Sequence, residues 1–483
     1  MPSRASALRH AVPSLASDTA WYSVAGAVGK ALALLSVPFL TRALGPGDYG
    51  LVDLATATSG VLAVVAMFSG DIPAARVAAR AASASDRSRT YTEYVVAVAF
   101  LGVALAAIVI FFAQPVADVI WSSPGADGIV ILSAVLIPVS SVRAALVTLH
   151  RLEGDSRRFA VLATVDIVGQ LAFAVGLVAI GMGPMGAVTG FVAGSTLALI
   201  ATTVSSRGLL AGSFDPRSAA DLIVRGVPFL PAFVAFLAAD LVARSLVSDR
   251  LGQAAVGEVG IAIRIASVLA LLIAAFQLAW SPRAAAVTID DETKQVFSRT
   301  LVTYSVIAGF TCIALVSVGP EIISIVAGDR FDGGSAALPG LAVAAMLAGT
   351  HFILSIGSLA KGQTWMVAAS ALAGAAVQIL VTAATVSQLG LWAVGFGAVA
   401  GRAASVGLLG QRVAPAFGRG LLTAMAVLVA VAASTLVAGL IATEFSGLRP
   451  IRWLIAVSAG VAIALYAGRR LMPSTAGEPI ERV

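Results

Sequence analysis

The chain has 483 residues, of which 59% are hydrophobic and only 12% are charged, and its mean hydropathy is +0.97. Ordinary soluble domains carry roughly a quarter charged residues, so this composition excludes a water-soluble globule. The net charge of +6 comes from Lys and Arg residues scattered at the ends of apolar runs, and without a clustered basic patch nucleic-acid binding is not expected.

The first residues, MPSRASALRHAVPSLAS, contain Arg4, Arg9 and His10 but no apolar core and no early cleavage site. A removable signal peptide needs both. We therefore expect residues 1–18 to form a cytoplasmic tail.

From there to the C-terminus, apolar stretches of about 20 residues recur, each long enough to cross the roughly 30 Å hydrocarbon layer as a helix. Gly, Pro and charged clusters separate them. The pattern predicts an all-α polytopic membrane protein with about 14 transmembrane helices, near 19–42, 51–72, 91–113, 128–150, 159–181, 186–205, 227–247, 257–280, 300–319, 337–360, 365–388, 390–410, 420–441 and 452–468.

The distribution of positive charge tests this number of crossings, because cytoplasmic loops carry an excess of Lys and Arg. With the N-terminus inside, most of the 31 basic residues fall on inner loops, tails and inner ends of spans. The outward-facing exceptions are Arg42, Arg250, Arg330, Arg449 and Arg452. The asymmetry predicts a multi-pass protein of the cytoplasmic (inner) membrane with both termini in the cytoplasm.

A turn motif, L-G-x-x-x-x-G, occurs twice: as LGPGDYG from Leu44 and as LGQAAVG from Leu251, 207 residues later. Each copy follows the first helix of a group of six, and the next helix in each group is followed by a proline, Pro73 or Pro282. Six intervening spans make the two groups parallel repeats. We expect the glycines to allow a tight outer turn and the prolines to kink or stop the second helix.

This duplication predicts two parallel six-helix lobes around a central cavity, followed by two C-terminal helices, which is an architecture typical of transporters. The expected organisation is a tail (1–18), an N-lobe (19–206), a cytoplasmic linker (207–226), a C-lobe (227–410), a helical pair (420–468) and a second cytoplasmic tail (469–483).

Several stretches, in this order, carry a resemblance to a known family: TRALGPGDYGLVDL, GDIPAARVAAR, LHRLEGDSRRFAVLATVD, FDPRSAADLIVRGVPFLPAF, LGQAAVGEVGIAIRIAS and PEIISIVAGDRFDGG. Over roughly residues 15–415 the chain resembles the polysaccharide biosynthesis flippases of the multidrug/oligosaccharidyl-lipid/polysaccharide exporter superfamily. The individual motifs are diffuse, and their order carries the resemblance.

The resemblance implies a bilobed fold that moves an isoprenoid-pyrophosphate-linked oligosaccharide from the inner to the outer leaflet. The partners it implies are that substrate, membrane lipids, glycosyltransferases and a polysaccharide polymerase. The alternative is a cation-coupled small-molecule or drug antiporter of the same superfamily, which would favour acidic cavity residues and usually ends after twelve spans.

An anionic pyrophosphate needs a wet, cationic chamber, so basic residues inside spans are the candidates for substrate contact. They are Lys30, Arg143, Arg264 and Arg402, together with Arg76 at the cytoplasmic mouth. Each has a structural alternative: an acidic partner such as Asp53 or Asp240 for Lys30, snorkelling to the interface for the buried arginines, and ordinary positive-inside charge for Arg76.

Acidic residues at similar depth are candidates for ion coupling or for structural ion pairs. Asp166 could couple transport to protons or sodium. Asp240 and Arg244 are four residues apart on one predicted helix, where their side chains can pair with each other.

The sequence contains no phosphate-binding loop, no zinc-type cluster of Cys and His, and no nucleophile elbow. The single cysteine, Cys312, lies in an apolar run and is expected to pack as a small hydrophobic residue. We expect no cofactor, no metal and no enzymatic chemistry.

Overall fold

The computed structural model describes residues 4–274, 276, 291–360, 364–417, 420–444, 450–455 and 458. Within these ranges the chain is helical and contains no strand. Among the residues that the structure describes, twelve helices are long and apolar enough to cross a membrane. One of the twelve segments, Leu34–Ala78, joins parts of the first two predicted spans, and most of the fourteenth span lies outside the described residues. The prediction of an all-α membrane protein with about 14 spans is confirmed.

The first half of the chain supplies α1 to α7 and the short elements that follow them. Their bounds are α1 (Arg4–Ala66), α2 (Asp71–Ala78), α3 (Ala84–Phe111), α4 (Ala113–Pro115), η1 (Val116–Ile120), α5 (Asp127–Leu152), α6 (Ser156–Ala179), α7 (Gly183–Ser206), η2 (Arg207–Leu209), α8 (Pro216–Gly226) and η3 (Val227–Phe229). The longest, α1, contains the first predicted span and residues 51–66 of the second, with a break in its helical geometry at Gly45.

The second half begins with α9. The bounds here are α9 (Leu230–Leu251), α10 (Gln253–Ala266), α12 (Asp291–Ser317), α13 (Gly319–Ala327), η4 (Asp329–Phe331), α14 (Gly334–Ala360), α15 (Thr364–Leu389), α16 (Trp392–Phe417) and α17 (Gly420–Glu444). Pro282, the expected counterpart of Pro73, lies outside the described residues.

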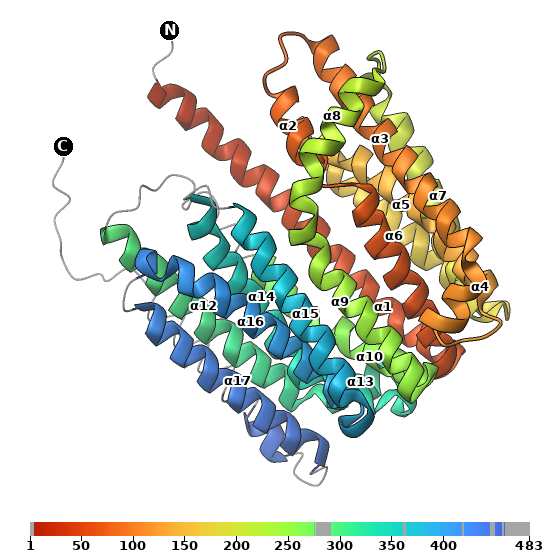
Figure 1. The fold of residues 1–483 in the computed structure, drawn as a ribbon, viewed down its shortest axis with the longest axis vertical. Coiled ribbons are helices and arrows are strands. Elements are labelled where there is room, and N and C mark those ends of the chain that lie inside the picture. Colours follow the sequence, from red (N-terminus) through yellow and green to blue (C-terminus); the bar gives the residue numbers. More distant parts are fainter. Residues whose placement is uncertain are drawn as a thin grey trace.

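The two halves gather into two bundles (Figure 1). In the first, α3 and α7 pack on α5, and α6 packs on α7; in the second, α16 packs on α14 and α15. The bundles lie closest at the end that carries α10 and α13 (Figure 1). The turn at Gly45 lies at the same end, since Pro46 lies against Gly257 of α10, and this end is called here the Gly45 end. The bundles diverge toward the end that carries α2 and α8, called the α8 end (Figure 1).

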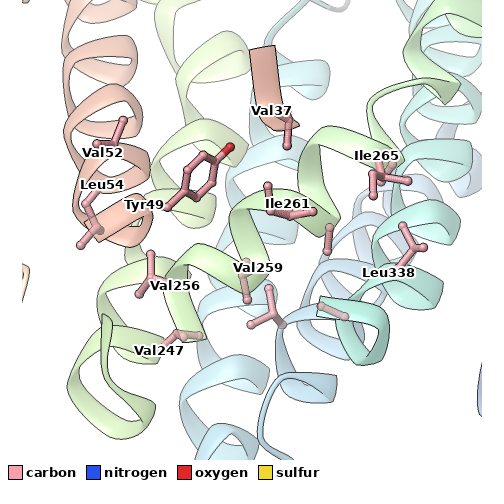
Figure 2. Packing of buried hydrophobic residues seen from close by; sticks show 14 of the residues in the cluster. Val37, Tyr49, Val52, Leu54, Val247, Val256, Val259, Ile261, Ile265 and Leu338 are labelled. Atoms are coloured by element: carbon pink, nitrogen blue, oxygen red, sulfur yellow. The ribbon is translucent and has the colours of Figure 1, made fainter. Parts of the chain in front are cut away.

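Hydrophobic contact between the halves is made mainly by α1, which packs on α9, α10 and α13. Tyr49 and Val52 of α1 and Val256 and Ile261 of α10 belong to one continuous core cluster that extends through both bundles. Figure 2 shows these side chains beside one another. Burial of apolar area therefore joins the halves at the Gly45 end.

At the α8 end, a separate cluster forms within the first half. Phe68, Tyr94 and Leu149 pack there with Ala219 and Leu222, the buried hydrophobic side chains of α8. The predicted linker, 207–226, thus contains an amphipathic helix that packs on α2 and α3. Asp215 caps its first turn, and Pro216 occupies a helix start where its missing N–H is harmless.

The second span ends earlier than the sequence predicts. The helix stops at Ala66, and Phe68 and Ser69 adopt positive φ angles of 40° and 53° in the turn that follows. Pro73 then lies in the first turn of α2, where proline is tolerated, so it does not stop the preceding helix.

The helices after α16 extend the second half: α17 packs on α12 and α14. The next segment is held by Arg452, whose side chain is buried and forms an ion pair with Glu321 of α13 at 2.6 Å. Its guanidinium also donates to the carbonyl oxygen of Ala442 at 3.0 Å. Arg452, one of the arginines predicted to face outward, is therefore neutralised by an acidic partner.

Candidate functional site

The charges inside the spans fall into two groups: those that are neutralised by a partner and those that are not. This division decides which residues could attract an anionic substrate, because an unpaired charge in a low-dielectric region exerts the strongest field.

Arg143 and Asp166 form an ion pair within the first half. Arg143 of α5 lies 3.1 Å from Asp166 Oδ2 on α6, and Ser195 of α7 donates its hydroxyl to Asp166 Oδ1 at 3.0 Å. Both side chains are largely buried, with 15% and 7% exposure. The arrangement ties three helices of one bundle together and leaves neither carboxylate oxygen of Asp166 without a partner.

Arg244 and Asp53 form a second buried ion pair, which joins the two halves. Arg244 Nε on α9 donates to Asp53 Oδ2 on α1 at 2.7 Å. The expected side-chain pair between Arg244 and Asp240 is not formed, since Arg244 donates instead to the backbone carbonyl oxygen of Asp240 at 3.1 Å. A carboxylate from another helix, distant in sequence, lies within reach of the guanidinium and forms the ion pair instead.

Asp240 has a different partner in the second half. Gln378 Nε2 on α15 donates to its Oδ1 at 2.6 Å. One turn earlier on α9, the ring of Phe236 lies under the guanidinium of Arg402, with 3.5 Å between the guanidinium carbon and the ring centroid. Such a cation–π contact stabilises the charge without neutralising it.

Arg264 and Arg402 form no ion pair with any carboxylate in the part of the chain that the structure describes. Both are partly buried. Arg264 on α10 lies over the ring of Tyr49, 5.4 Å from its centroid, so both arginines contact the face of an aromatic ring. Among the predicted basic residues that are partly or largely buried and whose side chains are described, they are therefore the ones with capacity left for an anion.

The remaining two predicted basic residues have different surroundings. Arg76 is exposed near the C-terminal end of α2, with its guanidinium 5.8 Å from the ring centroid of Phe229 in η3. Lys30 lies on α1, but its side chain is outside the described residues. Among the side chains that the structure describes, the predicted basic residues do not form one compact cluster. They are distributed over both bundles.

The sequence alone did not identify two of the residues that contact the buried charges, Asp53 as the partner of Arg244 and Gln378 as the partner of Asp240. Asp53 was considered only as a partner for Lys30, and Gln378 was not singled out. The signal for Asp53 was present, since an acid inside a span needs compensation. The identity of its partner was not accessible, because Arg244 is 191 positions away.

Cys312 is fully buried, and its Sγ lies 3.4 Å from the carbonyl oxygen of Ala342. This agrees with the expected role as a packed small residue. No group of three or more metal-binding side chains is found among the residues described.

Comparison with solved structures defines the class of protein. The fold is similar to an inward-facing multidrug resistance MATE family transporter of the MOP superfamily, with a TM-score of 0.61 and 15% identity over 83% of this chain and 95% of that one. It is similar to the lipid II flippase MurJ in an inward closed conformation, with a TM-score of 0.62 and 11% identity over 93% and 99%. An outward-facing MATE structure gives a TM-score of 0.53 at 15% identity over 86% and 96%. The protein has the fold of the MOP superfamily transporters and is a multi-pass membrane protein.

The sequence defines the family within that class. The model of the polysaccharide biosynthesis protein family matches residues 39–335, and the chain belongs to this family. Comparison with curated proteins gives no match.

Proposed function

We propose that the protein is a flippase of the cytoplasmic membrane. It moves an isoprenoid-pyrophosphate-linked oligosaccharide from the inner to the outer leaflet by alternating access, and it serves surface polysaccharide synthesis. The N-lobe (19–206) and the C-lobe (227–410) enclose the cavity, and both termini face the cytoplasm. Glycosyltransferases that assemble the glycan and a polymerase that consumes it are the expected partners.

The observation that carries the proposal is that two intramembrane arginines, Arg264 and Arg402, have no acidic partner among the described residues. A buried cation without a counter-ion is costly, and a planar guanidinium can hold phosphate oxygens in a bidentate way. A diphosphate supplies the missing counter-charge. Membership of the polysaccharide biosynthesis family supports a glycan attached to it.

The alternative, a cation-coupled small-molecule antiporter, requires a buried acid that is free to bind a cation. The two predicted candidates are both occupied: Asp166 by Arg143 and Ser195, and Asp240 by Gln378. Their contacts favour a structural role, and this supports the anionic substrate over the cationic one.

The test is translocation of an undecaprenyl-pyrophosphate oligosaccharide bearing a fluorophore on its sugar, in liposomes that contain the purified protein. A membrane-impermeant quencher reports the fraction in the outer leaflet. We expect Arg264→Ala and Arg402→Ala each to slow translocation about tenfold or more, because a charge-assisted hydrogen bond to phosphate contributes about 1.5–3 kcal/mol. The same experiment with Lys30→Ala tests the site whose side chain is not described.

Arg250 provides a matched control: it is an exposed arginine that contacts Asp249 at 2.8 Å. Arg250→Ala should leave translocation at the wild-type rate. Wild-type rates in both Arg264→Ala and Arg402→Ala would rule out the cationic chamber. Proton- or sodium-driven export of cationic drugs, with no lipid translocation, would establish the antiporter instead.

A further inference from the structure

The two copies of the L-G-x-x-x-x-G turn have the same backbone conformation. Gly45 has φ 73° and ψ 173°, and Gly252 has φ 87° and ψ 174°. This combination of positive φ with extended ψ is essentially restricted to glycine. The repeat in the sequence is therefore a repeat in structure, with one copy in each half of the protein.

The second glycine of each copy lies against the backbone of the other copy. A Cβ atom on Gly50 would overlap the carbonyl oxygen of Gln253, and a Cβ atom on Gly257 would overlap that of Pro46. The same hypothetical atoms would lie 3.1 Å from the nitrogen of Gly257 and 3.2 Å from the nitrogen of Gly50. Gly50 and Gly257, like Pro46 and Gln253, are separated by the repeat offset of 207 residues. The contact is thus reciprocal, as pseudo-two-fold symmetry requires.

One turn further along the helices, the two copies differ: the first has an aspartate where the second has a glycine. Asp53 and Gly260 are again 207 residues apart, and a Cβ atom on Gly260 would lie 2.8 Å from the carboxyl carbon of Asp53. The space left by the missing side chain is filled by this carboxylate. Asp53 in turn accepts the hydrogen bond from Arg244 of the opposite half.

These contacts lie at the Gly45 end, where the bundles converge, whereas the bundles diverge at the α8 end (Figure 1). A further contact closes the same end: Gln253 Nε2 donates to the carbonyl oxygen of Trp121 at 2.6 Å, and Ser248 donates to the same oxygen. All of them join the first half to the second.

We propose that the two glycine turns, residues 44–50 and 251–257, form the reversible closing contact of the outer face. This inference rests on the alternating access in the proposed function. With the turns in contact, the outer face is closed, as in this structure. When the halves separate there, Gly50 and Gly257 part and the outer face opens. Backbone-to-backbone contact suits this role, because it forms without ordering long side chains.

The experiment measures the distance between spin labels on the two halves at the Gly45 end. The labels are attached to Asp118→Cys in η1 and Gln388→Cys near the end of α15, both exposed positions. The native Cys312 is fully buried and does not compete for the label. Double electron–electron resonance on the protein in liposomes, without any substrate, then gives the populations of short and long distances.

We expect Gly50→Ala and Gly257→Ala to reduce the short-distance population about tenfold or more relative to the long-distance one, because the added methyl group has no room in the closed state. Gly47→Ala is the matched control: it lies in the same turn, and no atom lies within 4 Å of its hypothetical Cβ. It should give the wild-type distribution.

Wild-type distributions in both Gly50→Ala and Gly257→Ala would overturn the proposal. Failure of both variants to fold, while Gly47→Ala folds, would also overturn it, since a contact that opens and closes cannot be required in every state. The measurement does not depend on the substrate. If Gly50→Ala and Gly257→Ala lose the short distance but the wild-type protein translocates no lipid, the closing contact is supported and the flippase function is rejected.

Discussion

The two buried ion pairs have nearly the same chemistry but join different parts of the molecule. Arg143 and Asp166 connect helices within the first bundle, while Arg244 and Asp53 connect the two bundles. In each, an arginine meets an aspartate at about hydrogen-bonding distance in a largely buried place. A pair within a bundle persists when the bundles move as rigid bodies. A pair between bundles is broken when they separate, so the same interaction contributes to stability in one case and to conformational preference in the other.

The largest effect is expected from breaking the pair within the bundle. Asp166→Ala leaves Arg143 buried without its counter-ion, and we expect the free energy of unfolding to fall by about 3–5 kcal/mol. Thermal and denaturant unfolding of the purified protein measure this loss. The double variant Arg143→Met with Asp166→Leu removes both charges and should recover most of the stability. If Asp166→Ala unfolds at the same temperature and denaturant concentration as the wild-type protein, the ion pair does not stabilise the bundle.

A smaller effect on stability, together with a larger effect on conformation, is expected at the pair between the bundles. In Asp53→Ala, Arg244 escapes its uncompensated burial when the halves separate, so the open state becomes favoured. We expect the short distance between labels at residues 118 and 388 to lose population. A double-mutant cycle with Arg244→Gln should give a coupling of about 0.5–3 kcal/mol in the closing equilibrium. If Asp53→Ala loses much stability but keeps the wild-type distance distribution, the pair between the bundles contributes only to stability, like the pair within the bundle.

The smallest effect is expected at a partly exposed ion pair, in which Arg89 Nη2 lies 3.0 Å from Asp215 Oδ2. Asp215 also caps α8, and hydrogen bonds from the Ser218 hydroxyl and the Arg217 amide lower its pKa below the ordinary 3.8. Its contribution is therefore present above the ordinary pKa and is lost as the pH falls through the lowered value. Asp215→Ala should speed amide hydrogen exchange in α8 without altering the label distances.

Asp215→Asn separates the cap from the charge, because asparagine caps helices about as well as aspartate. It should keep the slow exchange of α8. A changed label distance in Asp215→Ala would mean that α8 takes part in the movement of the two bundles.

The candidate site was predictable in part. Residue types and depth marked Arg264 and Arg402 as buried cations, because the cost of an ion in hydrocarbon follows from its position in a span. Which arginines keep their charge available was not predictable. Arg143 and Arg402 look alike in sequence, but a carboxylate lies beside the first and a phenylalanine ring lies beside the second.

The sequence by itself determined the helical type and the approximate number of the membrane spans, the duplication and the position of the two glycine turns. These follow from local causes: apolar stretches long enough to span a bilayer, and glycines that alone accept the backbone angles at residues 45 and 252. Only the tertiary structure decided which residues of the two copies meet. It placed Gly50 against Gln253 and Asp53 against Arg244, contacts between residues some 200 positions apart. Such contacts depend on how two bundles meet, and no local property of the chain specifies that geometry.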